Sequence, residues 1–174
     1  MIYYQSKYLS DRLNVNLAKW KRWSRSFLPP DPLGGLQSGI ARQFNLKEVF
    51  KVYLGGYLVS ELKFTIPEAT KIVTDLSPWL KGQGFFQLQP HNQNGNDPLA
   101  SRHTIFIFET MTNGRFAYCI RTLHAAGAQD GQWRETYDRT LIHADDDPLH
   151  SGQALSAHLL AITALYEKVL NDLR

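Results

Sequence analysis

The sequence predicts an α+β fold with a helical first half, followed by a small antiparallel β-sheet segment and a C-terminal helix. Apolar residues recur with a period close to 3.6 over 46–62, and they alternate with polar residues over 104–111 and 115–123. The 174 residues are 43% hydrophobic and 20% charged, which is a globular composition. The length suits one ordinary domain or two small ones. We expect a boundary after Lys81, giving domains at 1–81 and 82–174.

Two short helices joined by a tight turn are expected at the start of the chain. The first spans 7–13 with Ser6 as its N-cap, and the second spans 17–25 with Asn16 as its N-cap. The segment 14–16 leaves room only for a tight turn. Two helices this short, connected this closely, describe a helix-turn-helix.

A helix stop, a glycine-rich segment and two longer helices are expected next. Pro29 and Pro30 end the second helix, because proline lacks an amide hydrogen and clashes with the preceding turn. Residues 31–43 suit a hairpin loop, or wing, that closes with a short extended segment. The longer helices are predicted over 46–62 and 66–80. Their N-caps, Asn45 and Thr65, are each followed three positions later by glutamate, as in a capping box.

Strand-forming patterns begin after Lys81. Asn113-Gly114 between two alternating segments is the strongest short-range signal of a β-hairpin, because both turn residues need positive φ. The polar residues 90–103 indicate an exposed loop. The expected strands are 85–88, 104–111, 115–123 and 133–143.

The last helix is expected over 152–173. Its apolar residues are spaced 4, 3, 4, 3 and 4 apart, which forms a heptad seam. The seam consists of Leu155, Leu159, Ile162, Tyr166, Val169 and Leu173. It can pack on the sheet as a core helix or pair with a second copy of the chain, and both interpretations stay open.

The charge of the chain is concentrated at its start. The net charge is +3, but residues 1–60 carry nine Lys or Arg against three Asp or Glu, so the remainder is acidic. The second predicted helix holds Lys19, Lys21, Arg22 and Arg25, interleaved with tryptophans. At 100° per residue, the last three of these cations share one face, which suits the major groove of DNA. Such binding would weaken steeply with salt, and a merely solvated charged face is the alternative.

The segment from Ser6 to Leu80 resembles the DNA-binding domain of MerR-type transcriptional regulators. The resemblance lies in the order of its features: a helix-turn-helix over 9–23, the stop Leu28-Pro29-Pro30, a wing with Gly39 and Arg42-Gln43-Phe44, and a helix pair. It covers about 75 of the 174 residues. It implies a winged helix-turn-helix that binds double-stranded DNA.

The resemblance also implies which residues contact DNA and how the chain assembles. Lys21, Arg22 and Trp23 stand where the family has an arginine and two tyrosines, and Arg42 matches the wing arginine that contacts the backbone. The expected DNA-binding residues are Asn16, Lys19, Lys21, Arg22, Trp23, Arg25, Arg42 and Gln43. A homodimer on inverted half-sites is implied. Because a β-rich segment replaces the family's dimer helix, dimerisation is expected through the seam residues above, the sheet, or both.

Other classes of protein are less favoured. We find no catalytic constellation, and we expect neither a metal nor a cofactor, because Cys119 is a single cysteine in an apolar strand and the six histidines are scattered.

The aromatic residues of the second half form a core or line a pocket for a flat apolar ligand. Without a signal peptide or an 18-residue apolar run, we expect no membrane segment and a cytoplasmic, nucleoid-associated protein. The alternatives are an architectural, excisionase-like, plasmid or phage DNA-binding factor, and a ligand-binding or protein-interaction module without DNA binding.

Overall fold

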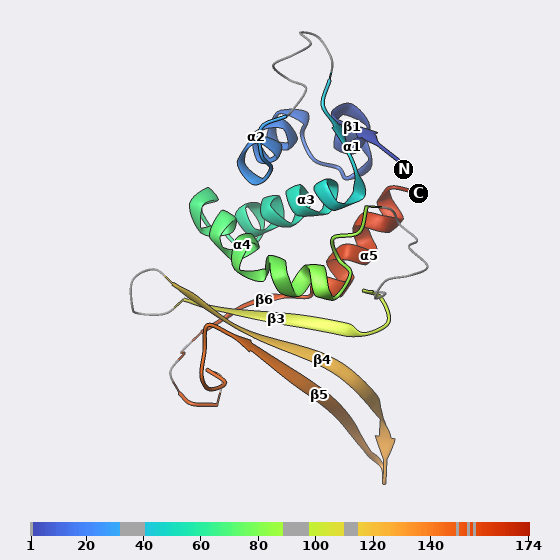
Figure 1. Cartoon of the computed structure of the whole chain (residues 1–174). Coiled ribbons are helices and arrows are strands. Elements are labelled where there is room, and N and C mark those ends of the chain that lie inside the picture. The colour runs from blue at the N-terminus through green and yellow to red at the C-terminus, as the bar shows by residue number, and fades with distance from the viewer. Residues whose placement is uncertain are drawn as a thin grey trace. The chain divides into compact units, whose positions relative to one another are not determined.

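The computed structural model has five helices and six strands among its described residues, so the α+β class is confirmed (Figure 1). The described residues are 2–31, 41–88, 98–109, 115–148, 150–152, 154 and 156–174. Contacts divide the chain into one unit of residues 1–98 and 166–174, and a second unit of residues 99–165. The boundary predicted after Lys81 therefore lies inside the first unit.

The first unit is mainly helical. It contains β1 (Tyr4–Gln5), α1 (Ser6–Arg12), α2 (Leu17–Phe27), β2 (Gln43–Phe44), α3 (Leu46–Ser60) and α4 (Ile66–Gly82). Strands β1 and β2 form a two-stranded antiparallel sheet, in which Tyr4 is opposite Phe44. The extended segment expected before α3 is therefore present as β2. Most of the predicted wing, residues 32–40, lies outside the described residues.

Side-chain caps fix where three of the four helices begin. The Asn16 side chain accepts hydrogen bonds from two amides of the first turn of α2. Asn45 with Glu48, and Thr65 with Glu68, form reciprocal capping boxes that start α3 and α4. These three predictions are confirmed. The predicted Ser6 cap is wrong, because α1 begins at Ser6 itself and its N-cap position, Gln5, makes no side-chain cap bond.

Two adjacent glycines of α3 allow α2 to pack closely against it. A methyl group added at Gly55 would lie 2.6 Å from the ring of Phe27, and one added at Gly56 would lie 2.2 Å from the ring of Trp23. Both distances are far below van der Waals contact. The glycines cost helix propensity, but they remove the side chains that would otherwise hold α2 away from α3.

The segment after α4 is a turn, so the strand predicted at 85–88 is wrong. Gly84 has a φ of 84°, and the Phe85 amide donates a hydrogen bond back to the carbonyl of Leu80, which is a helix-ending geometry. Phe85 is fully buried, and its ring lies 5.4 Å from Tyr166 and 6.0 Å from Phe50. Phe85 therefore packs in an aromatic cluster of the first unit and takes no part in a sheet.

The second unit is built on a four-stranded antiparallel sheet with the order β5-β4-β3-β6. The strands are β3 (Arg102–Glu109), β4 (Phe116–Gln129), β5 (Gln132–Ile142) and β6 (His158–Leu160). The first three match predicted strands, although β4 continues six residues beyond the predicted end at Leu123. The expected Asn113-Gly114 turn between β3 and β4 lies outside the described residues.

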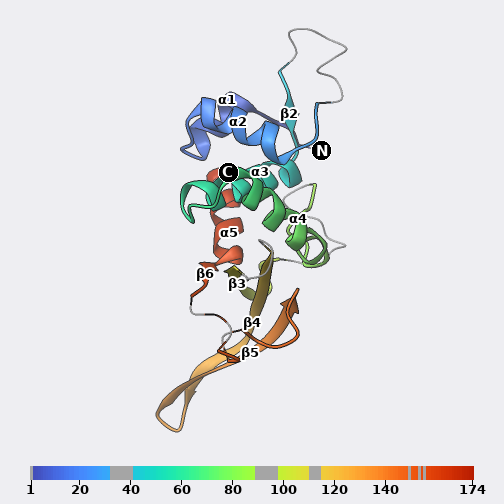
Figure 2. The same ribbon diagram turned by 90° about the vertical axis from the view of Figure 1, so that its left-hand side faces the viewer.

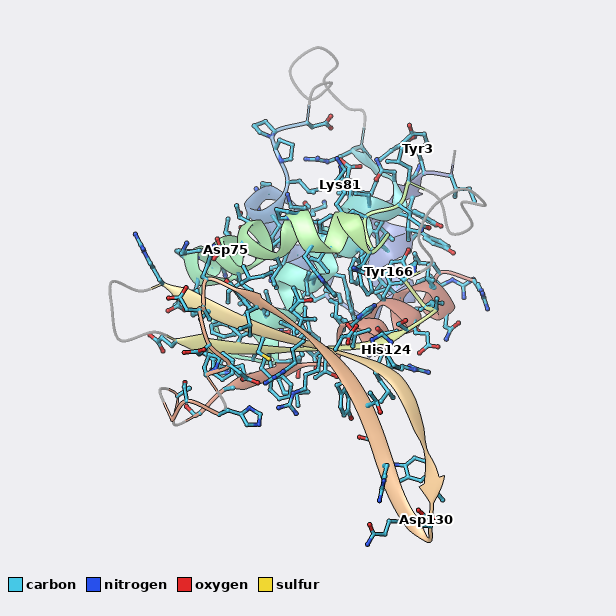
Figure 3. The ribbon with its side chains drawn as sticks, turned by 60° about the horizontal axis from the view of Figure 1, so that its bottom comes forward. Tyr3, Asp75, Lys81, His124, Asp130 and Tyr166 are labelled. Carbon is cyan, nitrogen blue, oxygen red and sulfur yellow. The ribbon has the colours of Figure 1, made fainter. Side chains whose placement is uncertain are left out.

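Strands β4 and β5 extend past the rest of the sheet as a two-stranded ribbon (Figures 1 and 2). The pairing of β3 with β4 ends at Arg102 opposite Leu123, whereas β4 and β5 stay paired as far as Gln129 opposite Gln132. Asp130 and Gly131 form the tip, both with positive φ as in a type I′ turn. Figure 3 shows Asp130 at this tip and His124 nearer the sheet, where the register shifts.

The long C-terminal helix predicted over 152–173 is wrong in its first ten residues. The helix α5 spans only Ile162–Asp172, and residues 158–160 form β6, which pairs with β3. Ile105 lies opposite Leu160 in this pairing, so a strand more than 50 residues earlier in the chain sets the local conformation. The contact division falls within α5, between Leu165 and Tyr166.

Candidate nucleic-acid interface

Helix α2 has one apolar, buried face and one cationic, exposed face. Trp20 is fully buried, Trp23 is 7% exposed and Phe27 is 4% exposed. The other face exposes the four predicted cations, which are Lys19, Lys21, Arg22 and Arg25. At 100° per residue, these four side chains leave the helix within an arc of about 160°. The predicted cationic face is therefore present.

No acidic side chain offsets these charges within α2, because the sequence of the helix contains no Asp or Glu. Among the residues that the structure describes, none of the four cations forms an ion pair with a carboxylate. The face carries a local charge of +4 with its ammonium and guanidinium groups open to solvent. A surface of this kind attracts a polyanion and exchanges its counterions on binding.

The back face of α2 holds the helix in one orientation. The Trp20 ring contacts Phe44 of β2 edge to face, with ring centroids 5.6 Å apart. Trp23 and Phe27 pack against the backbone of Gly56 and Gly55 in α3. These contacts bury large rigid rings, so the cations project from a fixed base rather than from a mobile loop.

Two residues predicted to contact DNA have other roles in the structure. Trp23 lies in the core against Gly56, so its predicted role as a DNA-binding residue is corrected to a packing role. Asn16 is exposed, but its side-chain oxygen is used in capping α2. The 100° spacing could have indicated the position of Trp23, because it places this residue on the side of α2 opposite Lys21.

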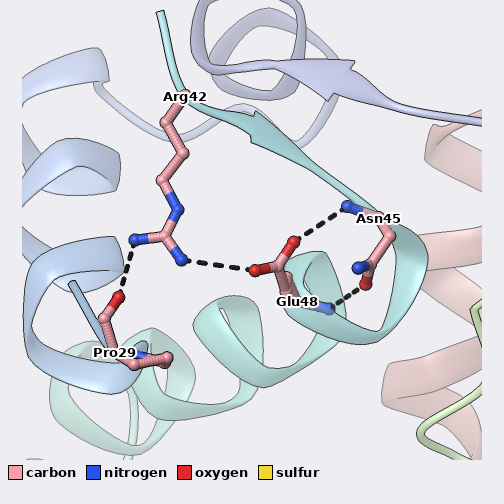
Figure 4. Close-up of polar contacts among 4 residues, drawn as sticks. All are labelled: Pro29, Arg42, Asn45 and Glu48. Atoms are coloured by element: carbon pink, nitrogen blue, oxygen red, sulfur yellow. Dashed lines mark hydrogen bonds and ion pairs between the residues drawn. The ribbon is translucent and has the colours of Figure 1, made fainter. Parts of the chain in front are cut away.

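Arg42 links three segments of the first unit (Figure 4). Its Nη1 donates to the carbonyl oxygen of Pro29 at 2.9 Å, and its Nη2 donates to Oε1 of Glu48 at 3.2 Å. The other carboxylate oxygen of Glu48 accepts from the Asn45 amide in the capping box. Arg42 thus joins the segment after α2 to the first turn of α3. The next residue, Gln43, which is also predicted to bind DNA, lies on β2 and is exposed.

A groove of about 630 Å³ runs beside the cationic face of α2. Lys21 and Arg25 of α2 form one wall, and Lys7 and Arg42 lie elsewhere along the lining. The groove is open and is bordered by Asp31 and Ala41, which belong to the segment 31–43 predicted to be the wing. The exposed cations of α2 and the base of the predicted wing therefore border the same groove.

The residues predicted to form a dimer seam do not share one exposed helix face. Ile162, Tyr166 and Val169 are buried within the chain, Leu159 lies on β6, and Leu173 is half-buried. Leu155 lies outside the described residues. The seam therefore splits between a strand and a core-facing helix, and of its described members only Leu159 is largely exposed.

The second unit holds a buried charged group, the carboxylate of Asp147. Asp147 is 8% exposed, and its Oδ2 accepts from Arg139 Nη1 at 2.9 Å and lies 3.0 Å from His150 Nδ1. The three-residue spacing of Asp147 and His150 was the available sequence signal. Among the described residues, no group of three or more His, Cys, Asp or Glu side chains forms a metal-binding arrangement.

Cys119 and His103 are both buried in the second unit. Burial raises the pKa of the Cys119 thiol, and its neighbours Phe108 and Ala117 are apolar, as expected for a cysteine in an apolar strand. Burial lowers the pKa of His103, whose Nδ1 lies 2.9 Å from Thr122 Oγ1. Of the aromatic residues expected to form a core or line a pocket, Phe85, Phe108, Phe116 and Tyr118 are buried, whereas Trp133 and Tyr137 are exposed on β5.

The fold and this site define an α+β protein with a fixed, cationic, amphipathic helix close to its N-terminus. Comparison of the chain with protein-family models, curated proteins and solved structures finds no match. No helix in the described part of the chain combines the length and apolar character needed to cross a membrane.

Proposed function

We propose that this protein is a sequence-specific transcriptional regulator of the MerR type that binds double-stranded DNA as a homodimer on an inverted repeat. The observation that carries the proposal is the exposed cationic face of α2, which has four basic residues and no acidic one. An α-helix fits the major groove, where cationic side chains reach both phosphates and base edges. In this proposal α2 is the recognition helix.

The surrounding elements support the proposal. The order α1, turn, α2, proline stop, β2, α3 and α4 follows the order of the winged helix-turn-helix domain that the sequence resembles. Arg42 acts in this proposal mainly as a positioning residue, because its two hydrogen bonds hold the end of α2 against α3. Lys21 and Arg22 are the principal DNA-binding residues, with Lys19 and Arg25 on phosphates.

Binding of the full chain to a pool of genomic DNA fragments tests the proposal. We expect a protected inverted repeat and an affinity that falls steeply as salt rises. Lys21→Ala combined with Arg22→Ala should abolish the footprint. It should also lower the slope of log K against log salt by about one for each phosphate that these side chains neutralise.

A matched control removes two exposed cations from α4 instead, by Lys71→Ala with Lys81→Ala. This control changes the net charge by the same amount, so it should leave the footprint intact. Equal loss of binding in both variants would show that only net charge matters, and full binding by the α2 variant would refute α2 as the recognition helix. Uniform bending without a footprint would favour an architectural factor.

A further inference from the structure

Strand β5 is a long, exposed sheet edge. Its eleven residues include no proline, and none of them forms a bulge in the pairing with β4. Gln132 to Thr140 are exposed. Its inner side pairs with β4, and no described strand pairs with its outer side. The other edge strand, β6, has only three residues. A long sheet edge without a paired strand is a template for another strand.

The charges of β5 favour another copy of this strand over a polyanion. Arg134 and Arg139 are balanced by Glu135 and Asp138, so the strand carries no net charge. Opposite signs occur on each face. Glu135 and Arg139 lie on one face with Trp133, Tyr137 and Leu141, because side chains two apart point to the same side of a sheet.

Antiparallel pairing of β5 with itself has one register in which every residue has a partner. That register is centred on Tyr137, the midpoint of 132–142. It puts Glu135 opposite Arg139 twice and Trp133 opposite Leu141 twice, with the two Tyr137 side chains facing each other. Directly opposed side chains of opposite charge stabilise a strand pair, and so do opposed apolar ones. The length of the strand and its charge pattern therefore select the same register.

The side chains at this edge are exposed and apolar enough to gain from burial. Trp133 is 68% exposed and Tyr137 is 41% exposed. The Glu135 carboxylate already accepts hydrogen bonds from both, from Trp133 Nε1 at 3.1 Å and from the Tyr137 hydroxyl. These bonds hold the two rings and the carboxylate in a row along one face of the ribbon.

We propose that a second copy of this chain pairs with the free edge of β5, antiparallel and centred on Tyr137, to form a continuous eight-stranded sheet. This inference deepens the proposed function, because it names the surface through which the homodimer would form, and it is tested without DNA. A dimer that is unaffected by the charge exchanges would refute pairing at β5 and leave dimeric DNA binding standing, whereas a monomer would refute both the pairing and the homodimer. Pairing at β5 also assigns self-association to a surface different from the predicted C-terminal seam.

Charge exchange across the edge tests the register. Sedimentation velocity of the full chain should show a dimer. Its dissociation constant should rise on the order of tenfold or more in Glu135→Arg and in Arg139→Glu, because each change places like charges directly opposite each other at two positions. The double exchange should restore the dimer. A mixture of the two single variants should form a heterodimer, because every pair across the edge again has opposite charges.

The rescue experiments and one control variant separate the register from side effects of the charge changes. Arg139→Glu also breaks the ion pair with Asp147, but the double variant and the mixture regain dimerisation only if the residues face each other. Arg134→Glu is the control, since Arg134 faces Thr140 in this register, and its dimer should resemble that of the unchanged chain. Loss of the dimer in this control would refute the register centred on Tyr137, because a register one residue away places Arg134 opposite Asp138.

Crosslinking gives a direct readout of the centre. Tyr137→Cys should form an intermolecular disulfide on mild oxidation, because its two copies are directly opposed, while Trp133→Cys should not. The native Cys119 is buried and serves as an internal background. The proposal would be overturned if the chain stays monomeric at all concentrations. It would also be overturned if none of the charge exchanges changes the dissociation constant of the dimer.

Discussion

The packing of α2 on α3 leads to a sharp prediction at Gly56. A methyl group at this position would lie 2.2, 2.4 and 2.5 Å from three carbons of the Trp23 ring, whereas ordinary contact begins at 3.4 Å. The helices must therefore separate, or the ring must move, by about 1.2 Å. Trp23 is buried, and an indole is too rigid to yield at one atom only, so the strain is shared by the whole interface.

The sign of the effect follows from two opposing magnitudes. Replacing glycine by alanine inside a helix gains about 0.5–1 kcal/mol of backbone stability. Overpacking a close-packed core costs about 1–3 kcal/mol. We expect Gly56→Ala to lower the free energy of unfolding by about 1–2 kcal/mol, which lowers Tm by about 2–8 °C in a chain of this size. Urea and thermal unfolding followed by circular dichroism measure both quantities.

Two comparisons test whether the clash is the cause. Gly82→Ala is the matched control, because a methyl group there meets nothing within 4 Å, and we expect it to be neutral or slightly stabilising. In a Trp23→Leu background the ring is absent, so Gly56→Ala should cost nothing further, and the double-mutant cycle should give a coupling of about 1–2 kcal/mol. A Gly56→Ala protein as stable as the unchanged chain would refute the close-packing argument.

Three further predictions concern single side chains. Arg42→Ala should lower the free energy of unfolding by about 1–3 kcal/mol, since it removes donors from Glu48 and the Pro29 carbonyl, while Gln43→Ala on exposed β2 should change little in the same denaturation assay. Burial lowers the pKa of His103, so the folded state binds fewer protons than the unfolded one. Stability should therefore fall as pH drops below about 6.5, and less steeply in His103→Gln, as measured by urea titrations at several pH values. Cys119 should resist a thiol reagent until urea unfolds the chain, whereas a cysteine placed at exposed Ser151 should react at once.

Local signals in the sequence predicted the helical half well. Asn16, Asn45 and Thr65 were identified as caps because a cap needs only the residue and the next three amides. The cationic face of α2 was predictable for the same reason, since the 100° spacing lies within one helix. The burial of Trp23 was harder to see, because it depends on Gly56 in another helix.

The helix predicted to begin at residue 152 was wrong because pairing with a distant strand determines the structure there. The 4, 3, 4, 3, 4 spacing continues through Leu159, yet this residue lies on β6 because β3 offers it an edge to pair with. A heptad pattern cannot distinguish these outcomes, since it records only spacing along the chain. The strand predicted at 85–88 was also wrong. The positive φ of Gly84 turns the chain there, and Phe85 packs into an aromatic cluster.

If both proposals hold, pairing at β5 has a measurable consequence for DNA binding. A dimer carries two copies of α2, so the second half-site is bound at the effective concentration set by the first. Glu135→Arg should therefore weaken binding to an inverted repeat while leaving binding to a single half-site unchanged, because it touches no residue of α2. The salt slope on the repeat should fall toward the half-site value, since a single subunit neutralises only half as many phosphates as the dimer. Anisotropy titrations on both DNAs measure these quantities, and equal weakening on both would show instead that Glu135 acts on DNA or on folding.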